Sequence, residues 1–233
     1  MGKLIIVRHG ESRWNLCNRF TGWVDVPLSD NGVKEAQECA RHCAKFDFDA
    51  AFTSNLERAQ ETLLIILSLQ GRTAIVQHAD DIRYRKWLRQ SNRCSTGDIP
   101  VFRNEHLNER YYGSLQGADK THAEKRYGKE NVFLWRRGYD SRPPGGAETL
   151  REAFERAWPY VSRRIVPRVR RGETILLAGH GNTLRSIIKH VEGISDEDAL
   201  FIDLPEAEAI VYDYRRGAFA RTKGEYRFNR PLR

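Results

Sequence analysis

Two short motifs end in histidine and glycine, Val7–Gly10 (VRHG) and Ala178–Gly181 (AGHG), and each closes an apolar run. A neutral imidazole is a competent nucleophile at physiological pH and needs no separate base. Attack of His9 on a phosphoryl group would give a phosphohistidine, and such a transfer needs positive charge around the phosphoryl oxygens. Arg8 beside it and Arg58 further along could supply that charge. Either histidine alone is more often structural, but the pair with its arginines favours phosphoryl transfer.

Apolar runs mark the strands that would position these motifs. Lys3–Val7 and Thr174–Ala178 are predominantly apolar throughout, which is typical of strands covered on both faces. Asp49–Thr53, Thr73–Gln77 and Ala209–Tyr214 predict three more strands. Ligands of open α/β sheets bind beyond the carboxyl ends of the strands, so the two histidine motifs should meet at one site.

Segments with helical periodicity separate these strands. The first of them can be capped by Ser29 or Asp30. Pro159 and Pro167 should bend or divide the longest one. The alternation of strands and helices predicts an α/β domain of three layers. The predicted helices cover residues 30–44, Glu57–Leu69, Ala118–Tyr127, Glu130–Arg137, Ala147–Arg170 and 181–191.

Composition narrows the classes of partner. The chain carries 39 Lys and Arg against 31 Asp and Glu, a net charge of +8, which favours either nucleic acid or small anionic ligands such as phosphates. No apolar run approaches the roughly 20 residues of a membrane helix. The sequence enters its first strand without the layout of a signal peptide, so a cytoplasmic protein is expected.

The four cysteines make no disulfide framework in a chain of this size. Cys39 and Cys43 stand one helical turn apart with His42 between them. A metal site there would lack a second pair of ligands at a suitable spacing, so buried or half-buried helix cysteines are favoured and no metal is expected.

Longer motifs resemble the cofactor-dependent phosphoglycerate mutases of the histidine phosphatase superfamily. The resemblance runs in order over most of Met1–Val191. Leu4–Asn15 (LIIVRHGESRWN) places the chain in the superfamily, whereas Leu107–Gly117 (LNERYYGSLQG) and Trp135–Gly138 (WRRG) point to its mutase branch. The resemblance implies a single domain over 1–233. Its expected fold is a three-layer sandwich, with a mixed, mainly parallel sheet flanked by helices.

The resemblance implies a role for each matching residue. His9 resembles the nucleophile, Glu109 the general acid and base, and Arg8, Arg58 and His180 the phosphate clamp. Contacts to the substrate's phosphate, carboxylate and other polar groups are implied for Ser12, Asn15, Thr21, Gly22, Arg110, Tyr111, Tyr112, Lys120, Arg136, Arg137, Gly181 and Asn182.

The implied reaction interconverts 3-phosphoglycerate and 2-phosphoglycerate in glycolysis and gluconeogenesis. Phospho-His9 would give its phosphoryl group to the substrate and take back the other one, after priming by free 2,3-bisphosphoglycerate. The arginines and histidine supply the charge, so no metal is needed. The expected partner is a small phosphorylated substrate rather than a membrane or nucleic acid. A homodimer or higher homo-oligomer stays open.

Three segments depart from the mutase pattern. Residues 83–103 form an unrecognised basic insertion, which we interpret as a surface excursion that is helical at first. Arg142–Thr149 (RPPGGAET) is short and resembles the turn of the superfamily's phosphatases, with Glu148 at the position of its glutamate. Leu204–Ala209 (LPEAEA) replaces a turn that contains glycine in the mutases, and the basic tail ends soon after it.

These departures leave two other functions open. A shorter cover over the site could admit water to phospho-His9, which would make the protein a phosphatase of small phosphate esters. Basic residues interleaved with Tyr84 and Trp87 could instead bind single-stranded nucleic acid on a retired enzyme scaffold. The second alternative is disfavoured because His9, Arg58 and Glu109 are all present.

Overall fold

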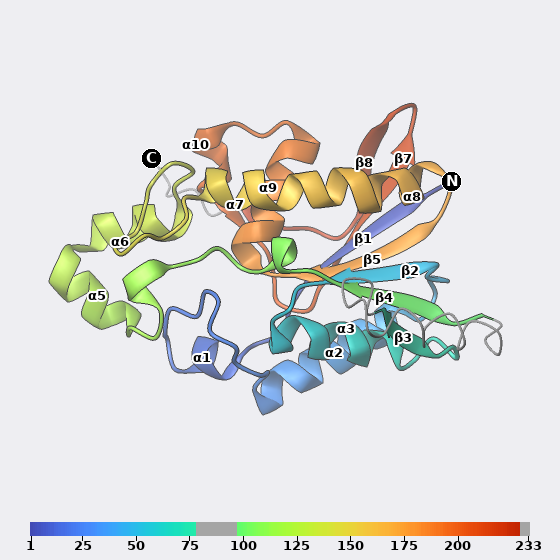
Figure 1. The fold of residues 1–233 in the computed structure, drawn as a ribbon, viewed down its shortest axis with the longest axis horizontal. Helices are drawn as coiled ribbons and strands as arrows, with labels where there is room; N and C mark the ends of the chain where they lie inside the picture. The colour runs from blue at the N-terminus through green and yellow to red at the C-terminus, as the bar shows by residue number, and fades with distance from the viewer. Residues whose placement is uncertain (78–96, 229–233) are drawn as a thin grey trace.

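A seven-stranded sheet forms the centre of the computed structural model, which describes residues 1–77 and 97–228 (Figure 1). The strand order is β3-β4-β2-β5-β1-β7-β8. The pairs from β3 to β1 are parallel, and β7 runs antiparallel to both β1 and β8. The mixed, mainly parallel sheet predicted from the sequence is therefore confirmed. The strands are β1 (Lys3–Arg8), β2 (Ala50–Thr53), β3 (Ala74–Gln77), β4 (Ile99–Arg103), β5 (Thr174–Gly179), β7 (Ala209–Arg215) and β8 (Ala218–Lys223).

The two central strands bring the histidine motifs together. β1 pairs with β5 in parallel register, from Lys3 opposite Thr174 to Arg8 opposite Gly179. The residue after each strand is therefore at the same edge of the sheet. This register explains why two histidines far apart in the sequence reach one site.

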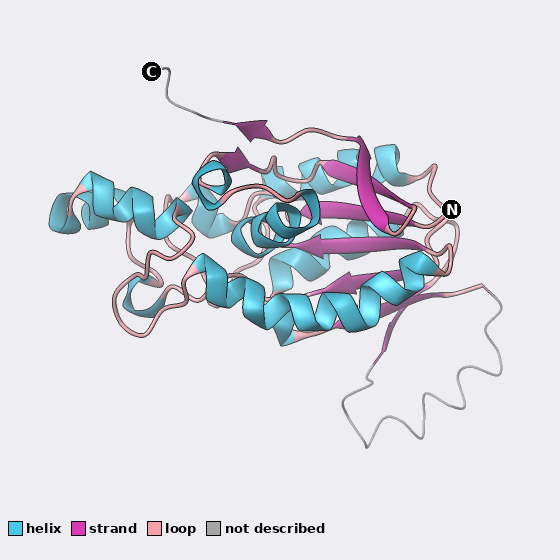
Figure 2. Ribbon diagram, turned by 90° about the horizontal axis from the view of Figure 1, so that it is seen from above, coloured by secondary structure: helices cyan, strands magenta, loops and turns pink. Residues whose placement is uncertain are grey.

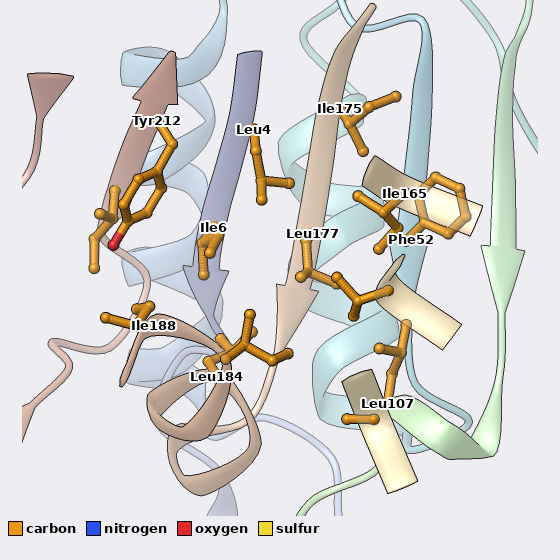
Figure 3. Packing of buried hydrophobic residues seen from close by; sticks show 14 of the residues in the cluster. Leu4, Ile6, Phe52, Leu107, Ile165, Ile175, Leu177, Leu184, Ile188 and Tyr212 are labelled. Atoms are coloured by element: carbon orange, nitrogen blue, oxygen red, sulfur yellow. The ribbon is translucent and has the colours of Figure 1, made fainter. Parts of the chain in front are cut away.

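Helices cover both faces of this sheet (Figure 2). Successive residues of a strand point to opposite faces, so Leu4 and Ile6 enter one core while Ile5 and Val7 enter the other. α2 (Asp30–Cys43) and α3 (Glu57–Leu67) pack on the second core. The first core, part of which Figure 3 shows, lies under α7 (Leu150–Tyr160), α8 (Val166–Arg170) and α9 (Gly181–Glu192).

The long helix predicted over Ala147–Arg170 is divided as its prolines require. α7 contains Pro159 near its end, and a π-helical turn, Val161–Ile165, separates it from α8. Proline has no backbone N–H and clashes with the preceding turn, so the regular α-helical ladder cannot continue through it.

Helices α5 (Lys120–Tyr127) and α6 (Lys129–Arg137) lie beyond one end of the sheet (Figure 1). They bury a small core of their own around Phe20 and Leu115. The remaining short elements are α1 (Arg13–Leu16), two 3₁₀ turns (Glu105–Leu107 and Gly113–Leu115), α10 (Asp196–Ala199), and the strand pair β6 (Ile202–Asp203) and β9 (Arg227–Phe228). No helix within 1–77 or 97–228 combines the length and the apolar character needed to cross a membrane.

Two predictions of secondary structure are corrected. The basic insertion was placed over residues 83–103, but its last five residues form β4, which pairs with β2 and β3 inside the sheet. Residues 83–96 lie outside the described part of the chain, and the single domain over 1–233 stays a prediction. The stretch after Arg215, predicted only as a basic tail, contributes β8 and β9. β8 is an edge strand with mostly exposed residues, so no alternation of apolar and polar residues marks it.

Candidate active site

A pocket of about 340 Å³ opens beyond the carboxyl ends of β1 and β5. Seven basic side chains line it against two acidic ones, which makes it an anion site by charge alone. Its lining consists of Arg8, His9, Asn15, Arg19, Phe20, Thr21, Gly22, Arg58, Glu109, Tyr112, Lys120, Arg136, Arg137, Gly181, Asn182, Arg185, Ile202, Asp203 and Leu204.

His9 presents one defined nitrogen as a nucleophile. Its Nδ1 lies 2.7 Å from the carbonyl oxygen of Gly10, which can only accept, so Nδ1 carries the proton. Nε2 is then the atom with the lone pair, and it accepts from Nε of Arg58 at 3.3 Å. Burial lowers the pKa of His9 well below its usual value, and the charges of Arg58 and Arg8 lower it further. His9 is therefore neutral and nucleophilic at physiological pH.

Arg58 is fixed by neutral backbone groups. Its side chain is buried, and its terminal nitrogens donate to the carbonyl oxygens of Gly22 (2.8 Å) and Val24 (3.1 Å). Burial lowers its pKa to about 10, so the guanidinium keeps its charge at neutral pH. Gly22 has a φ of +56°, and a Cβ there would lie 2.3 Å from Oε1 of Gln116, so this turn requires glycine.

His180 lies against His9 rather than on the pocket surface. The two ring centroids are 5.1 Å apart, and His180 is fully buried. Its Nε2 pairs with the hydroxyl of Ser54 at 2.7 Å, while its buried Nδ1 has no partner among the described residues. Burial, followed by the charge of Arg58, lowers the pKa of His180 well below its usual value. His180 is therefore a neutral ring that packs against His9.

Glu109 is the carboxylate that faces this basic pocket. It is 8% exposed, and its oxygens accept from the backbone N–H groups of Arg110 (2.7 Å) and Asn182 (3.4 Å). Asn182 follows Gly181 at the start of α9 and also donates to the hydroxyl of Tyr112 at 3.1 Å. The pocket thus contains an ordered proton acceptor next to the polar groups of α9.

Several positively charged side chains lie close together in the pocket lining around Lys120 and Arg185. Burial and, after it, the charges of Arg136 and Arg8 together lower the pKa of Lys120 to about 8. Burial, with Arg110 contributing, also lowers the pKa of Arg185 to about 9. A bound anion would reduce this mutual repulsion, so the pocket favours an anionic ligand.

Four predicted site residues do not line the pocket. His180 and Ser12 are fully buried, and Ser12 instead donates its hydroxyl to Asn15 at 2.6 Å. Arg110 is buried and donates to the hydroxyl of Tyr112 and the carbonyl oxygen of Trp135. Tyr111 packs against the indole of Trp23, with ring centroids 5.9 Å apart. These four residues are therefore not among those that line the pocket.

The structure also adds lining residues that the sequence analysis did not assign. Arg19, Phe20 and Arg185 lie within Met1–Val191, the stretch over which the sequence resembles the mutases, so a residue-by-residue comparison over that stretch could have found them. Residues 202–204 come from β6 and the turn after it. Asp203 accepts from Arg137 at 3.0 Å, and the carbonyl of Ile202 accepts from the same guanidinium at 2.9 Å. Only the pairing of segments that are distant in the sequence brings residues 202–204 to the pocket.

Two other predicted features are structural. The Glu148 carboxylate accepts from the backbone N–H of Tyr111 at 2.9 Å and pairs with Arg156 at 2.7 Å, which ties two loops together. Cys39 and Cys43 are buried with their sulfur atoms 3.9 Å apart, as expected for core helix cysteines.

Comparison with known proteins identifies the family of this chain. A family model, the histidine phosphatase superfamily (branch 1), matches residues 4–93 and 91–223. A 2,3-bisphosphoglycerate-dependent phosphoglycerate mutase from Methanococcus vannielii is 41% identical over 91% of this chain and 91% of its own. One from Methanosarcina acetivorans is 42% identical over 97% and 96%.

Solved structures share the fold at low identity. The crystal structure of phosphoglycerate mutase from Bacillus anthracis has a TM-score of 0.68 at 17% identity, and it covers 96% of this chain and 92% of its own. Bacillus stearothermophilus YhfR has a TM-score of 0.74 at 21% identity, with 94% of each chain covered. Sequence and fold together show that the chain belongs to the histidine phosphatase superfamily and, within it, to the 2,3-bisphosphoglycerate-dependent phosphoglycerate mutase family.

Proposed function

We propose that this protein is a phosphoglycerate mutase that interconverts 3-phosphoglycerate and 2-phosphoglycerate through a phosphohistidine at His9. The observation that carries the proposal is the lone pair of His9 Nε2, held by a neutral ring beside Arg58 at the strand-end pocket. The names of relatives about 40% identical over nearly the whole chain support this substrate class. The role lies in glycolysis and gluconeogenesis, from which we infer a cytoplasmic location.

His9 carries the phosphoryl group between two oxygens of the substrate. Nε2 forms the N–P bond as an O–P bond breaks, and in the reverse step a substrate hydroxyl attacks and the N–P bond breaks. Arg58 and Arg8 place positive charge next to His9, where the charge of the transferring group is concentrated. The side chains of Arg58 and Arg8 therefore supply positive charge for the transferring phosphoryl group.

Glu109 manages the proton of the substrate hydroxyl. As the hydroxyl attacks phospho-His9, the Glu109 carboxylate accepts its proton, and it returns a proton to the leaving oxygen when His9 takes a phosphoryl group back. Its nearly buried position on the pocket wall suits this exchange. Replacement by Gln should slow turnover by about 10²- to 10⁴-fold while charging of His9 by a good donor persists.

The pocket fits 2,3-bisphosphoglycerate as the priming donor. Two guanidinium nitrogens of its lining, Nε of Arg8 and Nε of Arg185, are buried and have no hydrogen-bond partner within the described chain. Arg136 and Lys120 add charge for a second anionic group. When bound, this molecule supplies the phosphoryl group that charges His9.

A coupled assay with 3-phosphoglycerate, run with and without 2,3-bisphosphoglycerate, tests the function. Mutase turnover should depend on priming and greatly exceed release of inorganic phosphate. Labelled 2,3-bisphosphoglycerate should leave an acid-labile, alkali-stable phosphate on the protein. His9→Ala should abolish that label, whereas His106→Ala, at an exposed histidine, should keep it. Phosphate release faster than isomerisation would instead identify a phosphatase, and persistent labelling of His9→Ala would overturn the assignment of the nucleophile.

A further inference from the structure

Arg8 is held from its outer side by the turn that follows β6. Its terminal nitrogens donate to the carbonyl oxygen of Leu204 at 2.7 Å and to the carboxylate of Glu206 at 2.6 Å. The Glu206 side chain is 25% exposed, so this ion pair is largely shielded from water. Each terminal nitrogen of the guanidinium therefore makes one hydrogen bond to this turn.

The third nitrogen of Arg8 stays available. Nε is buried and makes no hydrogen bond within the described residues. A Cβ built on Gly181 would lie 3.4 Å from this nitrogen, so Nε faces the start of α9. Arg8 and Gly181 both line the pocket, and an unused N–H donor beside a helix N-terminus suits an anionic oxygen.

The turn itself is fastened to the end of β1. The backbone N–H of Ala207 donates to the carbonyl oxygen of Arg8 at 2.9 Å, and Glu206 forms an isolated β-bridge with Arg8. The same turn follows β6, which pairs with β9. Glu206 is therefore fixed by backbone contacts on both sides and can hold the guanidinium in one orientation.

The negative charge of Glu206 is not required to hold Arg8. A neutral amide oxygen could accept the same hydrogen bond, whereas a carboxylate also subtracts charge from the pocket. Glu11 and Glu35 lie close enough to disfavour this charge, and burial raises the pKa of Glu206 despite the opposing effect of Arg8. A costly charge retained next to a phosphate site indicates a function in tuning that site.

We propose that Glu206 is a positioning residue for phosphoryl transfer, which holds the guanidinium of Arg8 in one orientation at the pocket and lowers the affinity of the pocket for phosphate groups. The two effects are separable, because the first needs a hydrogen-bond acceptor and the second needs a charge. Lower phosphate affinity favours release of the phosphorylated product. This inference rests on the proposed function only for the identity of the phosphorylated substrate.

Three variants separate these effects. Glu206→Gln keeps an acceptor and removes the charge, and Glu206→Ala removes both. Glu208→Gln is the matched control, since Glu208 carries the same charge two residues away and is exposed. The readouts are the dissociation constant of inorganic phosphate on the unphosphorylated protein, and kcat and KM with 3-phosphoglycerate.

Glu206→Gln should bind inorganic phosphate about fivefold more tightly and keep kcat within about a factor of two, whereas Glu206→Ala should lose about tenfold in kcat. Glu208→Gln should match the original protein in both. Equal phosphate affinity in Glu206→Gln and Glu208→Gln would overturn the proposed role of the charge. An unchanged kcat in a folded Glu206→Ala protein would overturn the role in positioning. Phosphate binding is measured without turnover, so the inference can fail or stand independently of mutase activity.

Discussion

Arg58 and Arg8 both place charge next to His9, but different partners hold them. On the Arg58 side, the guanidinium donates to two backbone carbonyls, those of Gly22 and Val24, and to His9 itself. On the Arg8 side, it donates to one carbonyl and to the carboxylate of Glu206. Arg58 makes no direct ion pair within the described residues, although the charges of Glu109 and Asp25 favour its charged form, whereas Arg8 shares its charge with an anion in direct contact.

The difference separates two tasks that an arginine performs at a phosphate site. Partial charges on carbonyl oxygens fix Arg58 without cancelling its charge, so it can stabilise the transferring phosphoryl group fully. The ion pair of Arg8 gives firm orientation at the expense of net charge. We infer that Arg58 contributes mainly to rate and Arg8 mainly to the balance between binding and release.

The most direct way to break this comparison is to remove each arginine in turn. Arg58→Ala should lower kcat by about a thousandfold, because it removes a positive charge that contacts His9 and is not held in a direct ion pair within the described residues. Arg8→Ala should cost about a hundredfold or less, because Glu206 already offsets part of that charge. Steady-state kinetics with 3-phosphoglycerate measure both.

A paired variant checks the reason for the difference. Arg8→Ala together with Glu206→Ala should recover part of the loss, since the single change leaves a carboxylate near the phosphate group. If Arg8→Ala is as harmful as Arg58→Ala, or if the paired variant recovers nothing, the two sides of the pocket do not differ as we infer.

Protein stability at mildly acidic pH should show the next largest effect. The pKa values of His9 and His180 are lowered in the folded protein, so the unfolded chain binds more protons as the pH falls through about 6.5. Stability is present above that pH and is lost below it, by about 1.4 kcal/mol per pH unit for each histidine. Urea unfolding at pH 7, 6 and 5 should show the decline, and His180→Asn should make the slope shallower, with His9 and His190, whose pKa burial also lowers, responsible for the remainder.

An exposed histidine supplies the control for that slope. His106→Asn should leave it unchanged, because His106 lies at the surface away from both arginines. A slope unaffected by His180→Asn would mean that burial at the end of β5 does not control this titration.

The pKa of His9 offers a sharper comparison of the two arginines. Burial is the largest cause of its lowering, Arg58 the second and Arg8 the third. Removing a nearby positive charge raises a histidine pKa, so Arg58→Gln should raise the pKa of His9 and Arg8→Gln should raise it by less. Titration of the His9 ring by NMR in the unphosphorylated protein measures both shifts. The reverse order would assign the stronger electrostatic coupling to the Arg8 side.

The smallest expected effect concerns the backbone of the turn on the Arg8 side. Ala207 has a φ of +48°, a left-handed conformation that suits glycine. Ala207→Gly should raise the free energy of unfolding by about 1 kcal/mol or less and leave phosphate affinity unchanged. Arg216→Gly, at a φ of +49° in the turn between β7 and β8, is the matched control. Altered phosphate affinity in Ala207→Gly alone would mean that turn conformation, rather than the Glu206 side chain, orients Arg8.

Local patterns predicted the central parts of this fold well. The apolar runs of β1 and β5 and the glycine after each histidine are visible within a few residues, and the parallel register then puts both histidines at one edge. Burial of β1 and β5 on both faces gives such strands their continuous apolar character. The proposed nucleophile, His9, and its neighbour Arg8 lie in the first of these motifs.

Elements defined by distant pairing could not be predicted in this way. β4 contains Pro100 and ends in Arg103, and only its parallel pairing with β2 and β3 shows that it is a strand. The contacts of Asp203 and Glu206 with pocket arginines depend on segments that lie far apart along the chain. No local pattern encodes such contacts, because they arise from packing rather than from spacing.

The position of β1 in the sheet has a consequence for synthesis on the ribosome. Its neighbours on either side, β5 and β7, begin only at Thr174 and Ala209. At about 5–20 residues per second, the first strand to emerge therefore waits on the order of ten to thirty seconds for its first hydrogen-bonding neighbour. During that time the apolar side chains of β1 have no sheet to enter.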